Sequence, residues 1–376
     1  MTRMRRWYVW LPISLLLLGL VVWRTRPWEV TALWERLDPL PLMAALLINV
    51  PIVALWAIRS RSLMAAVGHP LPLRELVPIV SFANTINNIT PASSGEVLRA
   101  LVLKRRHGVP FTRSGAVILI ERFWAIGIMG LSAGAAAVGT LAGAPASLSA
   151  LAWSAAVAGA FAPSIAYRLG LRPGRLLRRW GDPGAAAADD AAVVPGSVAG
   201  AAAAGAAAPP GRVRRLAAGL AELDDVLGEV VTDPRQAVSF VGTTALIFLG
   251  FALQLWLVLL ALRVSLPIEA AWAALGLATI AGVASALPFG LGATDVVLVV
   301  LLTSMGVATA PAGAAVLLLR ATATLPLGIA GAASWGVLSR GGQSLDVAAP
   351  SGEAQIAPAT ATDPRPDALG PAGARR

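Results

Sequence analysis

Several long runs without a charged residue constrain the fold of this chain more than any other feature. Among them are Trp7–Trp23, Leu40–Ile58, Ser147–Tyr167 and Ala237–Leu262, and none of these contains Asp, Glu, Lys or Arg. A helix of about 20 apolar residues crosses the hydrocarbon core of a bilayer. Only 13% of the residues are charged, whereas soluble domains carry about a quarter. The sequence therefore predicts an all-α polytopic membrane protein.

The basic residues predict how the chain is oriented, because Arg and Lys gather in cytoplasmic loops. Arg3, Arg5 and Arg6 place the N-terminus inside, and the apolar run after them predicts an uncleaved first helix. We expect about six transmembrane helices with both termini cytoplasmic. The net charge of +10 is almost all arginine, which is typical of a GC-rich bacterial genome and suggests the bacterial inner membrane. Anionic lipid headgroups are the expected partners of this charge, and nothing indicates nucleic acid.

The stretch "NNITPASSGEVLRALVLKRR", residues 87–106, predicts a re-entrant helical hairpin. The uncharged segment Val77–Gly95, which includes the first part of this stretch, has basic clusters on both sides, so a full crossing would place one cluster outside. Irregular backbone at membrane depth must be buried in protein or line a wet cavity. Its amides either cap a broken helix or contact a ligand, and these are Asn84, Asn87 and Asn88. The predicted helix breaks, here and in the later stretch "ALPFGLGATD", are Pro91, Gly95, Pro288, Gly290 and Gly292.

An internal repeat relates these two stretches. With an offset of 198 residues and no gap, Arg122 aligns with Arg320 and Gly108 with Gly306. The first unit begins on the cytoplasmic side and the second begins outside, so we expect inverted repeats at about 76–143 and 270–338. Inverted repeats in transporters place a binding site near the midplane, at broken helices. The predicted architecture is six transmembrane helices plus two re-entrant hairpins.

Six charged residues in or beside apolar segments are the candidate site. At a helix centre each costs about 2.5–3.5 kcal/mol, so we expect them to pair, face water or extend to the interface. Glu96 and Arg99 lie on one helical face and can pair locally. We expect Arg122 and Arg320 to face the carboxylates of the hairpins. Binding a substrate and only holding helices together both remain open for the set, which is Glu96, Arg99, Glu121, Arg122, Asp295 and Arg320.

The remaining segments carry less chemistry. Residues 1–338 are predicted to form the membrane domain, interrupted by a cytoplasmic low-complexity linker at 181–211 and followed by a disordered cytoplasmic tail at 341–376. An apolar 4-3-4-3 spacing from Leu216 to Val230 predicts an amphipathic helix that lies on the membrane or packs on the bundle. There is no cysteine, and there are two histidines, so no metal site or cofactor is expected.

Two parts of the chain resemble the membrane domain of the lysylphosphatidylglycerol synthases and their stand-alone flippase-like relatives. They are the stretch from "NNITPASSGEVLRALVLKRR" through Glu121-Arg122, and the turn "PFGLGATD" with the helices after it. The resemblance covers roughly residues 8–338. The family usually has Gly-Gly and a Glu in that turn, where this chain has Phe289-Gly290 and Asp295. The family's acid after Glu-Arg is also not evident here.

The resemblance implies a lipid-translocating, flippase-like role, with a phospholipid or a polyprenyl-phosphate-linked lipid as substrate. We expect no synthase activity, because no synthase-like sequence follows the membrane domain, and no ATP-binding motif is present. The alternative is a non-catalytic accessory subunit of a lipid- or glycolipid-modifying system. An intramembrane transferase is the least favoured hypothesis, since no metal cluster, Ser–His pair or diphosphate motif occurs in the sequence.

Overall fold

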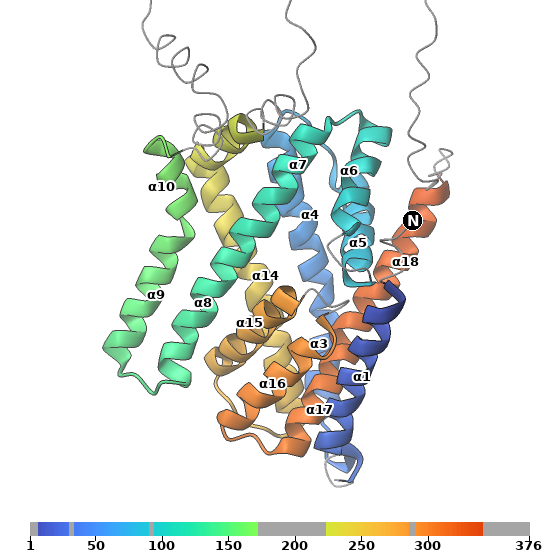
Figure 1. Ribbon diagram of the computed structural model, residues 1–376, viewed down its shortest axis with the longest axis vertical. Helices are drawn as coiled ribbons and strands as arrows, with labels where there is room; N and C mark the ends of the chain where they lie inside the picture. The colour runs from blue at the N-terminus through green and yellow to red at the C-terminus, as the bar shows by residue number, and fades with distance from the viewer. Residues whose placement is uncertain (1–6, 30–33, 90–93, 172–222, 286–289, 341–376) are drawn as a thin grey trace, which may run out of the picture.

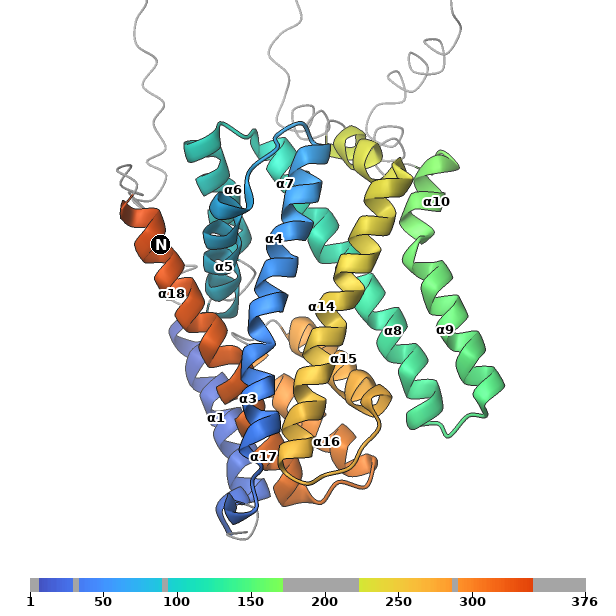
Figure 2. The ribbon, with the colours of Figure 1, turned by 180° about the vertical axis from the view of Figure 1, so that it is seen from behind.

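The structure, a computed structural model, describes residues 7–29, 34–89, 94–171, 223–285 and 290–340, and its regular secondary structure is helical throughout these ranges (Figures 1 and 2). The predicted all-α class is confirmed. The helices of the first half are α1 (Trp7–Thr25), α3 (Pro39–Leu47), α4 (Asn49–Ala66), α5 (Leu73–Ile89), α6 (Ser94–His107), α7 (Phe111–Leu119), α8 (Ala125–Thr140), α9 (Ala146–Ala160) and α10 (Ala162–Arg168). Those of the second half are α14 (Pro234–Ala261), α15 (Ile268–Ser285), α16 (Ala293–Ser304), α17 (Thr309–Leu319) and α18 (Leu325–Arg340).

Within the described residues, five helical stretches are long and apolar enough to cross a bilayer, and a bent pair makes a sixth. The pair is α9 and α10, which meet at 46°. The predicted number of about six is therefore confirmed. α15, predicted as one arm of a hairpin, is long enough to span, and the predicted first span forms the 19-residue apolar helix α1. The five stretches are Pro39–Ala66, Phe111–Thr140, Pro234–Ala261, Ile268–Ser285 and Thr309–Arg340.

The uncharged run Leu40–Ile58 predicts a second helix that ends at Ile58, but the observed helix continues beyond it. The helix α4 runs on to Ala66, so Arg59 and Arg61 lie within it and not in a loop. The chain becomes apolar again after Arg61, and Leu63 and Met64 are fully buried in the core. A helix that buries apolar residues on both sides of a charge persists through that charge, because packing and not local composition decides its length.

The two predicted hairpins correspond to two pairs of neighbouring helices. α5 and α6 lie in the upper half of Figure 1, and α15 and α16 lie in the lower half. α5 packs against α18, which belongs to the other half of the chain, and α15 packs against α8 in the same crossed manner. Residues 90–93 and 286–289, between the paired helices, lie outside the described residues. Re-entry into a membrane and the inverted repeat stay predictions.

The last long stretch of each half has the same internal construction. α7 continues through a π-helical turn at Ile120–Trp124 into α8, and α17 continues through a π-helical turn at Arg320–Thr324 into α18. Arg122 and Arg320 each lie inside such a turn. π-helical turns are rare and are often found at functional sites. The candidate site therefore lies at two interruptions of regular helix.

The buried apolar residues form two clusters, and the outer surface is also apolar. One cluster joins α4–α8 to the start of α14 and includes Phe240, and the other joins the end of α14 to α15–α17 and is rich in alanine. Leu16, Leu40 and Phe123 are more than two thirds exposed. Exposed apolar area on this scale fits contact with lipid.

The amphipathic helix packs on the bundle over its described part, residues 223–232. Val226 and Val230 enter the first core cluster. Tyr167 Oη donates a hydrogen bond of 2.8 Å to Asp224 Oδ1. Of the two predicted positions, packing on the bundle is therefore the observed one. The linker at 181–211 and the tail at 341–376 lie outside the described residues.

Candidate functional site

The first part of the site is a group of five charged residues, called here the arginine cluster: Arg59, Glu96, Arg99, Glu121 and Arg122. Arg99 on α6 makes an ion pair with Glu121 in the first π-helical turn, and both side chains are buried. Ser60 of α4 donates to Glu121 Oε1 at 2.7 Å and accepts from Arg99 Nη2 at 2.8 Å. Three helical segments that are distant in sequence are thereby joined at one carboxylate.

The neighbours Glu121 and Arg122 have different partners, as their positions on the helix predict. Arg122 Nη2 lies 3.8 Å from Glu96 Oε1, so it faces the carboxylate of the α5–α6 pair. Glu96 also accepts a hydrogen bond of 2.8 Å from Asn87 Nδ2, and its Oε2 lies 3.8 Å from Arg99 Nη1. The expected local pairing of Glu96 with Arg99 is present. Asn87 acts as a hydrogen-bond donor inside the cluster.

Arg59 is a member that the sequence reasoning missed. Its Nε lies 4.0 Å from Glu121 Oε1, its Nη1 donates to Thr244 Oγ1 at 3.2 Å, and its guanidinium lies 5.4 Å from the ring centroid of Phe240. The signal was the return of apolar residues after Arg61, which placed Arg59 inside a helix. With Arg59 the cluster holds three arginines against two glutamates, so its formal charge is +1.

The second part of the site is the Asp295–Arg320 pair. Asp295 is in the first turn of α16 and is 2% exposed, and Arg320 opens the second π-helical turn. Arg320 Nε and Nη2 donate to Asp295 Oδ1 at 3.1 and 2.8 Å. Asp295 Oδ2 accepts from the backbone N–H of Gly292 at 2.9 Å, so the same carboxylate also caps its helix. The expected pairing of Arg320 with the second hairpin's carboxylate is present.

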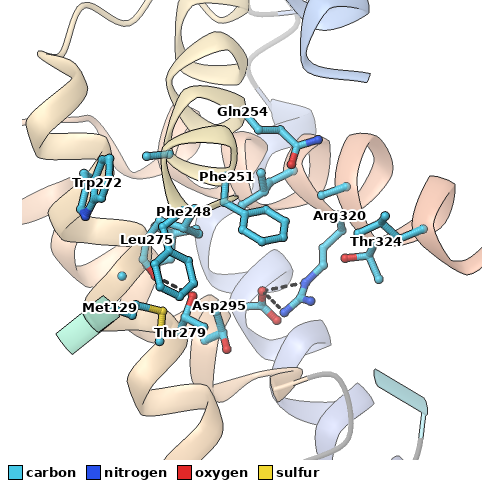
Figure 3. A pocket seen from close by; sticks show the side chains of 17 residues that line it. Met129, Phe248, Phe251, Gln254, Trp272, Leu275, Thr279, Asp295, Arg320 and Thr324 are labelled. Atoms are coloured by element: carbon cyan, nitrogen blue, oxygen red, sulfur yellow. Dashed lines mark hydrogen bonds and ion pairs between the residues drawn. The ribbon is translucent and has the colours of Figure 1, made fainter. Parts of the chain in front are cut away.

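A cavity of about 260 Å³ lies against this pair, between α14, α15, α16 and the second π-helical turn (Figure 3). Its walls are mostly apolar and aromatic, with Phe248, Phe251 and Trp272 among them. Figure 3 shows the guanidinium of Arg320 directed toward the carboxylate of Asp295 at one side of the cavity. This combination of apolar walls with a few polar groups is common in small-molecule and lipid sites.

Two buried amides hold the backbone of the second π-helical turn. A π-helical turn disturbs the regular hydrogen bonding of a helix and leaves carbonyl groups to be satisfied otherwise. The carbonyl oxygen of Thr322 accepts from Asn49 Nδ2 at 2.6 Å and from Gln254 Nε2 at 3.1 Å. Neither amide was predicted as a site residue, because each stands alone in an apolar run and only the fold brings them together.

The predicted helix breaks have mixed outcomes. Gly95 is the second residue of α6, next to the undescribed residues 90–93, and it is buried, so that a Cβ there would collide with the carbonyl oxygen of Ala83. Its role is close packing between α5 and α6. Gly290 and Gly292 have φ of 58° and 83°, values that favour glycine, so they are a true break. Pro91 and Pro288 lie outside the described residues.

The remaining amides near the first hairpin are less central. Asn84 is half-buried on α5, and its side chain makes no hydrogen bond to another described residue. Asn88 is helical in α5, and its side chain lies outside the described part of the structure. Within the described ranges, no group of three or more His, Asp or Glu residues could hold a metal ion.

Comparison with known proteins decides the family of this chain. Residues 9–331 match the family described as the lysylphosphatidylglycerol synthase TM region. The chain belongs to this family. The match covers both parts of the site and every helix that spans, apart from the end of α18.

Two curated relatives of this lysylphosphatidylglycerol synthase TM family member match over shorter stretches. One is the glycosyltransferase AglD of Haloferax volcanii, 29% identical over 110 residues, which are 29% of this chain and 18% of that protein. The other is a UPF0104 membrane protein of Methanothermobacter thermautotrophicus, 28% identical over 131 residues, which are 35% of this chain and 38% of that protein. The alignments span less than half of each relative.

Proposed function

We propose that this protein moves a phospholipid or a polyprenyl-phosphate-linked lipid across the membrane. The observation that carries the proposal is the Asp295–Arg320 pair, which lies among apolar helices and lines a cavity of about 260 Å³. A guanidinium is well suited to a lipid phosphate, because its N–H groups match the phosphate oxygens. The apolar walls beside it suit acyl or isoprenoid chains.

The arginine cluster supplies a second polar position in the other half of the bundle. A headgroup that leaves water without new hydrogen bonds loses several kcal/mol, so a path across the membrane needs polar contacts at more than one depth. Arg122 is 35% exposed at its side chain, in contrast to the buried Arg99. We propose that Arg122 and Arg320 bind the lipid phosphate one after the other. Glu96 of the α5–α6 pair holds Arg122, and Asp295 of the α15–α16 pair holds Arg320.

The distribution of basic residues supports one orientation for this transport. The last turns of α6, α10 and α18 carry Lys104, Arg105, Arg106, Arg168 and Arg340, and all three helices end at the top of Figure 1. By the positive-inside rule we propose that this end is cytoplasmic, in a bacterial inner membrane. Anionic lipid headgroups at that surface are the proposed partners of these residues.

Reconstitution into proteoliposomes tests the transport. Movement of a headgroup-labelled lipid between leaflets is measured for the wild type, Arg122→Gln and Arg320→Gln. We expect each variant to lose about tenfold in rate, since a hydrogen bond to a charged group contributes about 1.5–3 kcal/mol. The control is Arg263→Gln, whose side chain is 66% exposed and pairs with Asp38 outside the cavity. Unchanged rates in both site variants contradict the assigned roles.

We also propose that the lipid leaves covalently unchanged, so the protein is not itself an enzyme. Mass spectrometry of the lipids recovered from the same proteoliposomes tests this directly.

A second candidate function is an accessory subunit of a glycolipid-modifying system. It is favoured by the similarity to part of a protein named as a glycosyltransferase. A stable co-purifying transferase, together with absent lipid movement by the isolated protein, would favour that second function.

A further inference from the structure

The cavity beside the Asp295–Arg320 pair has a charge pattern that restricts the lipid it can take. Of the 17 residues that line it, only Asp295 and Arg320 are charged, and they form an ion pair with each other. Both oxygens of Asp295 already accept hydrogen bonds, one from Arg320 and one from Gly292. The lining thus offers no unengaged carboxylate to an ammonium group, and an ammonium in the cavity would also lie near the guanidinium of Arg320.

The lining does offer neutral hydroxyl groups. Thr294 precedes Asp295, and Thr324 ends the π-helical turn that Arg320 begins, so one hydroxyl accompanies each member of the pair. Neither hydroxyl makes a hydrogen bond to another described residue. In Figure 3 Thr324 lies beside the side chain of Arg320. A hydroxyl both donates and accepts, so it matches another hydroxyl better than a group that only donates.

The aromatic walls are compatible with the same ligand. Phe248, Phe251 and Trp272 give flat apolar surfaces on which the C–H face of a sugar ring or a polyol can lie. Aromatic rings also attract ammonium groups when these are not repelled by a nearby cation. The guanidinium of Arg320 in the same cavity weighs against that alternative, and the experiment below includes it.

We infer that this cavity recognises an uncharged, hydroxyl-bearing headgroup attached to a lipid phosphate, with Thr294 and Thr324 as the hydroxyl contacts. The inference rests on the proposed function for the identity of the ligand as a lipid. The inferred ligand differs from the lysyl lipid in the description of the family, because a lysyl headgroup carries ammonium groups. Glycerol or inositol phospholipids and polyprenyl-phosphate sugars share the required chemistry.

Lipid binding to the full chain in detergent, measured by native mass spectrometry, tests the inference without any transport. The probes are phosphatidylglycerol, phosphatidylethanol and phosphatidylethanolamine with the same acyl chains. Phosphatidylethanol has the charge of phosphatidylglycerol but no hydroxyl, so it corrects for general attraction of anionic lipids to a basic protein. We expect the wild type to bind phosphatidylglycerol about three- to tenfold more tightly than either other lipid, the range of one or two net hydrogen bonds.

The double variant Thr294→Val/Thr324→Val keeps the side-chain shape and removes both hydroxyls. We therefore expect it to bind phosphatidylglycerol no more tightly than the other two lipids. Thr303→Val is the matched control, because Thr303 is also on α16 but its hydroxyl donates to Val299 O and does not line the cavity. Three outcomes would overturn the inference. The wild type could bind phosphatidylethanol as tightly as phosphatidylglycerol, or bind phosphatidylethanolamine more tightly than phosphatidylglycerol. The double variant could also keep the preference for phosphatidylglycerol.

A fourth probe, a polyprenyl-phosphate hexose, identifies the source of the headgroup by its affinity relative to phosphatidylglycerol. The proposed function is judged separately by lipid movement in proteoliposomes. If the wild type moves no lipid but retains the hydroxyl preference, the transport proposal fails and the headgroup site stands. If lipid moves without that preference, the headgroup inference fails and the transport proposal stands.

Discussion

The arginine cluster and the Asp295–Arg320 pair occupy corresponding places in the two halves of the chain, yet they differ in how accessible they are. Arg99 and Glu121 are 3% and 8% exposed and are fixed by residues of α4 and α6. The Asp295–Arg320 pair lines a cavity, and the side chain of Arg320 is 22% exposed. The same kind of charge pair is thus built into the helix packing in one half and placed beside a ligand-sized space in the other.

This difference suggests a division of roles. Removing one partner of a buried ion pair leaves an uncompensated charge and costs far more than the pair itself contributes. The arginine cluster should therefore dominate stability, with Arg122 as its accessible member. The Asp295–Arg320 pair should dominate ligand recognition. The following predictions test that contrast, from the largest expected effect to the smallest.

Truncation of the two central carboxylates should separate the two regions most strongly. We expect Glu121→Ala to lower the free energy of unfolding by about 3–5 kcal/mol, because Arg99 and Arg59 then lack their shared carboxylate. We expect Asp295→Ala to cost less, because Arg320 reaches the cavity and can be solvated there. Unfolding in mixed detergent, followed by circular dichroism, measures both. Equal losses would remove the distinction between the two regions.

The glycines that bring paired helices together should show a smaller difference. At Gly95 an added methyl group meets backbone atoms of Ala83 and Asn87, whereas at Gly282 it first meets the side chain of Thr294. Since backbone cannot move aside as a side chain can, we expect Gly95→Ala to cost about 1–3 kcal/mol and Gly282→Ala less. Gly134→Ala, in open space within α8, is the control for the same unfolding measurement. A larger loss at Gly282 would show that the second helix pair is the tighter one.

The smallest effect should come from a charge pair outside both regions. Arg263 Nη2 lies 3.0 Å from Asp38 Oδ2, and its side chain is 66% exposed. Exposed ion pairs contribute about 0–1 kcal/mol, so Arg263→Ala should change the midpoint of unfolding very little. A loss as large as that of Glu121→Ala would mean that burial does not govern the cost of breaking a charge pair in this protein.

Much of the fold followed from the sequence, because long apolar runs and basic loops depend only on local composition. The pairing of Arg122 with Glu96 and of Arg320 with Asp295 was also predictable, since an intramembrane charge must find a partner. Arg59 was missed because it is the first charged residue after the uncharged run Leu40–Ile58, and we expected the helix to end at Ile58. Whether α5–α6 and α15–α16 enter a membrane from opposite sides remains a prediction.

The polar contacts that hold the π-helical turns could not be predicted from the sequence. Asn49 and Gln254 are about 200 residues apart in the chain, and nothing local indicates that both bind the carbonyl of Thr322. The close contact of Gly95 with α5 could not be predicted for the same reason, since a glycine in a break and a glycine in a close helix contact have the same local sequence. Tertiary packing distinguishes these cases.

The second π-helical turn has a geometric consequence for the whole of α18. Because an α-helix advances by about 100° per residue, the one extra residue of such a turn sets the angular phase of everything that follows it. That phase points Gly331 at Thr85 of α5, while Arg320 in the turn itself points at Asp295. Substitutions along α18 leave the phase intact, whereas a single insertion or deletion between Arg320 and Gly331 would turn the helix contact away from α5.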